Sequence, residues 1–173
     1  NVTNTVKTRA SSVLTPNNDL SYGYIEHIFV AGQLRPGDVL FVGSVSGKTA
    51  NVVELALQAR AHGLTVIVLT AMAYSPQLIS EHPSCKHLYE AADLVRDNGA
   101  PFGDAMLAVE GLNSPICPAS GIGAVTLLWA VVAGMVEEML ARGMMPTVYP
   151  SVNRPEGRTL VSQVDAEALR KGY

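Results

Sequence analysis

Apolar positions along the chain follow two patterns, helical spacing and short, continuously apolar runs. Residues 20–33 carry apolar side chains at helical spacing, which predicts an amphipathic helix. The runs 39–42 and 64–69 are almost wholly apolar and too short for helices, which is typical of strands buried on both faces. Residues 51–61 between them predict a helix that ends at Gly63. A strand, a helix and a second strand in this order predict a parallel sheet.

The second half of the chain continues this alternation with weaker signals. We expect a short helix opening at Ser75-Pro76, strands at 92–96 and 105–109, and a long apolar helix at 119–141. A loop over 145–158 and a terminal helix at 165–171 complete the pattern. The fold class is therefore α/β, with a mostly parallel sheet flanked by helices in a Rossmann-type three-layer arrangement.

Composition agrees with one domain that has a hydrophobic core. The chain has 173 residues, of which 48% are hydrophobic and 16% charged, and this excludes a disordered chain. We expect a loop or extension over 1–19, an α/β domain over 20–145 and a C-terminal loop with a short helix over 146–173. A net charge of −3 argues against a nucleic-acid partner. Two cysteines are too few for a disulfide scaffold and favour a reduced, cytoplasmic setting. The first 18 residues are polar and lack the apolar region of a signal peptide.

Residues 121–136 carry no charge, yet they predict a helix within a soluble protein. Sixteen residues fall short of the roughly 20 that a membrane-spanning helix needs. We expect no membrane partner, and a helix buried in the core or at a subunit interface. Because a helix that is apolar all round must be covered on all sides, a homo-oligomer follows.

The strongest chemical signal lies between the first predicted strand and the following helix, at residues 43–49 (GSVSGKT). Ligands bind at the carboxyl ends of parallel strands, where a helix N-terminus offers free N–H groups and a positive dipole end. Three hydroxyls and a permissive glycine therefore predict a phosphate site, made of Ser44, Ser46, Gly47, Lys48 and Thr49. Two alternatives stay open: the hydroxyls only cap the helix, and Lys48 either adds charge or faces solvent.

The same loop is not a nucleotide-binding P-loop. That motif places four residues between its two glycines, whereas three residues separate Gly43 from Gly47. The strand that ends at Thr70 also lacks a closing acidic residue for magnesium. We expect no metal and no cofactor.

The loop and the residues after it resemble the sugar isomerase (SIS) domain family. The resemblance rests on Ser44-x-Ser46-Gly47-x-Thr49 and on the strand ending in Thr70, and it spans about Pro36 to Met145. It also includes 82–89 (HPSCKHLY) and Pro101-x-Gly103-Asp104-Ala105, which are similar to a branch often labelled as phosphosugar or phosphoheptose isomerases. The resemblance implies that the loop holds the phosphate of a phosphosugar.

Departures from the family pattern limit what the resemblance implies. The family's first strand and its Ser-rich turn have no counterpart before Leu20, so we expect either a truncated chain or a partner that completes the site. The catalytic glutamate and late-helix histidine of phosphoheptose isomerases are missing as well. For aldose–ketose isomerisation the sequence offers Glu110 and His82 as acid–base candidates. Ser120 is a helix cap or a further ligand contact. The alternative function is a non-catalytic phosphosugar-sensing or assembly subunit.

Overall fold

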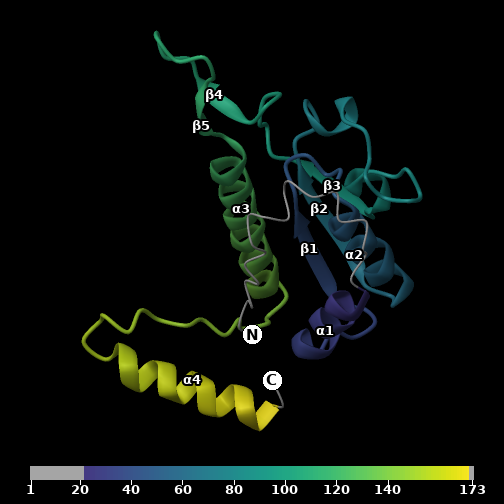
Figure 1. The fold of residues 1–173 in the computed structure, drawn as a ribbon. Coiled ribbons are helices and arrows are strands. Elements are labelled where there is room, and N and C mark those ends of the chain that lie inside the picture. Colours follow the sequence, from purple (N-terminus) through teal and green to yellow (C-terminus); the bar gives the residue numbers. More distant parts are fainter. Residues whose placement is uncertain (1–21, 172–173) are drawn as a thin grey trace. The chain divides into compact units, whose positions relative to one another are not determined.

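The fold is taken from a computed structural model, which describes residues 22–171 (Figure 1). Its first half alternates helices and strands as the sequence predicts. The elements up to residue 97 are α1 (Tyr22–Gly32), β1 (Val39–Gly43), α2 (Ala50–Ala61), β2 (Thr65–Thr70), the 3-10 turns η2 (Ser75–Gln77) and η3 (Leu88–Ala91), and β3 (Leu94–Asp97). The elements after it are β4 (Ala105–Leu107), β5 (Ile116–Pro118), α3 (Ser120–Ala141) and α4 (Gly157–Lys171).

The three strands of the first half form the predicted parallel sheet, in the order β1-β2-β3. Gly43 pairs with Leu69, and Thr70 pairs with Asp97, so the carboxyl ends of all three strands meet at one edge. The loop 43–49 starts from that edge. The α/β fold class with a parallel sheet flanked by helices is thus confirmed.

The hydrophobic core lies where α2 and η3 pack against this sheet. Val53, Ala56 and Ala59 of α2 are fully buried, as are Val66 and Val68 of the central strand. Small alanines at one-turn spacing let α2 approach the sheet closely, because helix positions three and four apart share a face. Gly63 then ends α2 with a φ of 82°, as predicted.

The prediction that β1 is buried on both faces is wrong within the part of the chain that the structure describes. Only Val42 of this strand is buried, whereas Val39 and Phe41 are exposed. Val39 and Phe41 alternate with Val42 along the strand, so they lie on the opposite face of β1, and that face is not buried in the described part of the chain.

The predicted strand at 105–109 does form, but not in the parallel sheet. β4 pairs antiparallel with β5, in a separate two-stranded sheet. The sequence did not indicate β5, because its three residues include Pro118 and are too short for a period of two to be visible. The terminal helix also begins earlier than predicted, at Gly157.

The described chain divides into two compact units, and the boundary falls inside α3, between Leu128 and Trp129. α3 spans nearly the predicted residues, and none of its residues is buried. Of the two predicted places for this helix, the core is therefore wrong for the described residues, and a subunit interface stays a prediction. By length and composition alone, α3 is long and apolar enough to cross a membrane.

Candidate functional site

The loop 43–49 is attached to the end of β2 through its backbone. The Ser44 N–H donates to the Leu69 carbonyl at 3.0 Å, and the Ala71 N–H donates to the Val45 carbonyl at 3.2 Å. The Thr70 hydroxyl donates to the same Val45 carbonyl at 3.2 Å. Three hydrogen bonds to the end of β2 therefore hold the backbone of Ser44 and Val45 in place.

Gly47 turns the loop towards α2 in a left-handed conformation, with a φ of 56°. Its N–H donates to the Ser44 Oγ at 3.2 Å, and its carbonyl accepts the Leu88 N–H at 2.8 Å. A Cβ on this residue would lie 2.8 Å from the Ser75 Oγ and 3.1 Å from the Thr70 Oγ1. The backbone thus rests directly on two buried hydroxyls, which explains why this position needs glycine.

The hydroxyls of Ser46 and Thr49 are unpartnered in the part of the chain that the structure describes. Thr49 is the N-cap residue of α2, with φ −68° and ψ 132°, yet its side chain makes no capping hydrogen bond. The alternative in which the loop hydroxyls only cap the helix therefore fails for Thr49. Ser44 differs, because its hydroxyl accepts from Gly47.

Lys48 is partly exposed and forms an ion pair, so its charge is already compensated within the protein. Its Nζ lies 2.6 Å from the Glu81 Oε1, and its carbonyl accepts the Glu81 N–H at 2.8 Å. The sequence analysis missed Glu81, because 33 positions separate it from Lys48 and no motif joins them. An acidic residue in the segment that follows the second strand was the one available signal.

His82 is buried in a hydrogen-bonded chain between α2 and the segment after β2. Its Nε2 lies 2.7 Å from the Glu54 Oε2, and its side chain is 6% exposed. The Ser84 N–H and Ser84 Oγ lie 3.1 and 2.7 Å from its Nδ1. Because Nδ1 accepts a backbone N–H, the neutral ring carries its proton on Nε2 and donates it to Glu54.

The other two predicted side chains are not joined to the loop by any hydrogen bond or ion pair among the described residues. Glu110 is exposed, in the turn after β4. The Ser120 hydroxyl donates to the Asp104 Oδ2 at 2.7 Å, and the Ser120 N–H donates to Oδ1 at 2.8 Å. Ser120 therefore belongs to the N-terminal cap of α3. Over residues 22–171, no group of His, Cys, Asp or Glu could hold a metal ion.

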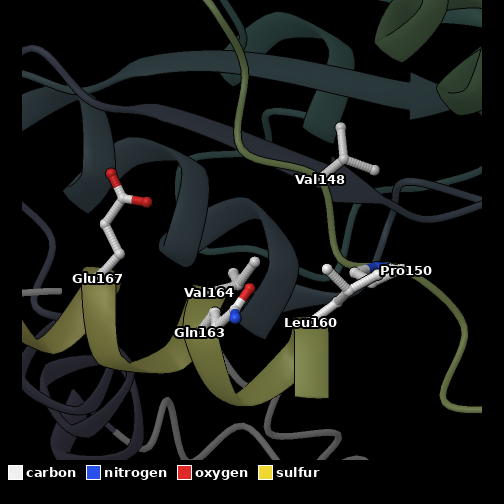
Figure 2. A pocket seen from close by; sticks show the side chains of 6 residues that line it. All are labelled: Val148, Pro150, Leu160, Gln163, Val164 and Glu167. Carbon is white, nitrogen blue, oxygen red and sulfur yellow. The ribbon is translucent and has the colours of Figure 1, made fainter. Parts of the chain in front are cut away.

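A hollow lies in the compact unit that begins at Trp129, and it contains none of the predicted site residues. Figure 2 shows it between α4 and the segment that precedes this helix. Its volume is about 390 Å³, and its lining is mostly apolar. The lining residues are Val148, Pro150, Leu160, Gln163, Val164 and Glu167. No sequence pattern indicates this hollow, and its lining offers no cluster of groups for acid–base or phosphate chemistry.

The loop 43–49 lies within the part of the chain that matches a known family. Residues 4–71 match the family model of the SIS domain, a range that contains β1, the 43–49 loop, α2 and β2. The match begins earlier in the chain than the resemblance at Pro36 indicated.

Relatives of this chain are found among bacterial UPF0309 proteins. One from Shouchella clausii is 35% identical over 144 residues, which cover 83% of this chain and 58% of the relative. One from Listeria monocytogenes is 39% identical over 142 residues, which cover 78% and 61%. One from Streptomyces griseus is 38% identical over 131 residues, which cover 76% and 52%. The chain thus spans 52–61% of the length of these relatives.

Proposed function

Because this chain is a SIS-domain protein, we propose that its 43–49 loop binds the phosphate group of a phosphorylated sugar. The observation that carries the proposal is that the hydroxyls of Ser46 and Thr49, at the N-terminus of α2, have no partner among residues 22–171. Hydroxyls that cap nothing, on a loop whose backbone is fixed, are available to a ligand.

The chemistry of the loop suits a phosphate group. The first N–H groups of α2 have no acceptor within the helix, and the helix dipole adds partial positive charge there. Ser46 and Thr49 add two donors that rotate to suit the phosphate oxygens. Because Gly47 and the hydrogen bonds to β2 hold the loop backbone in one conformation, less ordering of the backbone is needed on binding.

A thermal-shift measurement with sugar phosphates tests this proposal. A panel of hexose and heptose phosphates should include ligands that raise the melting temperature, since a ligand that binds the folded state stabilises it. The unphosphorylated sugars should leave it unchanged. The double variant Ser46→Ala/Thr49→Ala should lose the shift. Thr159→Ala/Ser162→Ala removes two exposed hydroxyls from α4 instead and should keep it. No shift with any phosphosugar would rule out the proposal.

Sugar-phosphate isomerisation is the second candidate function, and the Glu54–His82 pair favours it. Glu54 accepts from Nε2 and orients the ring, while Nδ1 accepts the Ser84 N–H at 3.1 Å, so the ring must release that hydrogen bond before Nδ1 can take a proton as a general base. The Ser84 hydroxyl also lies 2.7 Å from this nitrogen.

An NMR assay for aldose–ketose interconversion separates catalysis from binding alone. Turnover that is lost in His82→Ala or Glu110→Gln, while the thermal shift persists, would establish an isomerase. Binding without turnover in the unmodified chain would instead support a phosphosugar-sensing or assembly subunit.

We also propose that α3 is covered by a second copy of the chain. All 22 residues of this helix are unburied in the described structure, although it carries no charge between residues 121 and 136. Exposed apolar surface of this extent is typical of interfaces. Sedimentation velocity should show a dimer or larger assembly. A monomer that partitions into lipid vesicles would contradict self-association.

A further inference from the structure

The ion pair between Lys48 and Glu81 places a carboxylate beside the proposed phosphate site. Lys48 is the one charged residue within 43–49, and its Nζ lies 2.6 Å from the Glu81 Oε1. The Glu81 N–H also donates to the Lys48 carbonyl at 2.8 Å, so side chain and backbone join the same two residues.

We propose that Glu81 is a specificity-determining residue that restricts the loop to ligands with a single phosphate group. This inference rests on the proposed phosphate-binding function. With Glu81 in place, the positive charge of Lys48 is neutralised, and the loop offers hydroxyls and N–H dipoles to the anion. These hydroxyls and N–H groups supply enough hydrogen bonds for one phosphate group. They supply no net positive charge to balance a second one.

Because both side chains of the ion pair are exposed, a ligand bound at the loop can contact them. The Lys48 and Glu81 side chains are 38% and 49% exposed, so neither is sequestered from a molecule in the loop. A second phosphate group that extends from the loop would compete with Glu81 for Lys48 and would meet the carboxylate as a like charge. A singly phosphorylated sugar presents a neutral hydroxylated body at that point instead.

The segment that carries Glu81 is held in place independently of its carboxylate. The Leu88 N–H donates to the Gly47 carbonyl at 2.8 Å, and His82 bonds to Glu54 on α2. Replacing the Glu81 carboxylate therefore leaves the backbone attachment of the segment intact. The substitution Glu81→Gln changes the charge with little change in shape.

Isothermal titration with inorganic phosphate and with pyrophosphate tests the inference. Glu81→Gln should tighten phosphate binding about two- to fivefold, the range expected for releasing one exposed ion pair. The gain for pyrophosphate should be larger, so the ratio of the two dissociation constants shifts towards pyrophosphate. Glu26→Gln removes an exposed carboxylate from α1 and should change neither constant.

A double-mutant cycle shows whether the effect passes through Lys48. Adding Lys48→Met to Glu81→Gln should remove the gain, and Lys48→Met should weaken binding less when Glu81 is present than when it is absent. A gain that persists without Lys48 would overturn the inference, as would Glu81→Gln behaving like Glu26→Gln or binding phosphate more weakly. In these cases phosphate binding by the unmodified chain still stands. Absence of phosphate binding in every variant would instead overturn the proposed function and this inference together.

Discussion

The Oγ atom of Ser75 lies 2.8 Å from the point that a Cβ atom on Gly47 would occupy. Real Cβ atoms essentially never approach another atom below 3.0 Å. The Ser75 hydroxyl is itself fully buried and has no hydrogen-bond partner among the described residues. The loop therefore needs glycine at position 47 for two separate reasons, the close contact below it and its positive φ.

Gly47→Ala should destabilise the protein by about 1–3 kcal/mol, because alanine at a φ of 56° is strained and its methyl group meets buried atoms. Equilibrium unfolding in urea measures the loss. Gly99→Ala provides the matched control, since Gly99 also has a positive φ, 72°, but has nothing within 4 Å of its Cβ position. Equal losses in the two variants would show that the contact with Ser75 contributes nothing.

Ser75→Ala should raise the free energy of unfolding by about 1 kcal/mol, because a buried hydroxyl without a partner is costly to desolvate. The same urea titration measures it. Ser162→Ala, which removes an exposed hydroxyl from α4, should change stability little. A loss of stability in Ser75→Ala would mean that the hydroxyl has a partner in solution.

Asp104→Ala should destabilise the N-terminus of α3 by about 1 kcal/mol, the usual loss for a helix cap. The Asp104 carboxylate accepts hydrogen bonds from the Ala119 N–H, the Ser120 N–H and the Ser120 hydroxyl. Thermal melting followed by far-ultraviolet circular dichroism measures the effect. Asp104→Asn keeps one acceptor oxygen and should lose less. Equal melting of both variants and the unmodified chain would contradict the capping role.

Stability should depend on the ionisation of Glu90 at acidic pH. The His87 N–H donates to this carboxylate at 2.7 Å, and this hydrogen bond is the main cause that lowers the Glu90 pKa. A lowered pKa means that the stabilisation is present above the usual carboxyl pKa and is lost as the pH falls through the lowered value. The melting temperature should therefore fall more steeply in the unmodified chain than in Glu90→Gln once the pH drops below the usual carboxyl pKa. Parallel pH profiles would contradict this role.

The first half of the fold was predictable because its signals are local. A continuous apolar run marks β2, small apolar residues at helical spacing mark α2, and Gly63 marks the end of that helix. The loop 43–49 was predictable for the same reason, since its hydroxyls and glycine lie within seven consecutive residues. These patterns also sufficed to predict a parallel sheet, because a strand, a helix and a strand in succession connect in few ways.

The remainder could not be predicted, because it depends on residues that are distant in the sequence. The apolar run of β1 is compatible with a central or an edge strand, and only the strand order places it at the edge. β4 looked like a fourth parallel strand until its antiparallel pairing with β5 was known. From the sequence, Ser120 is compatible with a ligand contact or a helix cap. The structure decides for the cap, because the Ser120 hydroxyl donates to Asp104, 16 residues away.

By itself, the sequence determined which segments form the helices and strands from α1 to β3, and which loop to examine for phosphate binding. Those properties depend on spacing and on turn residues, which act between near neighbours. Only the tertiary structure decided which polar groups of that region are free and which are engaged. Within the described part of the chain, the hydroxyls of Ser46 and Thr49 have no partner. Lys48 is paired with Glu81, because the packing of the segment after β2 brings that carboxylate close to the loop. The same packing sets the 2.8 Å separation beneath Gly47.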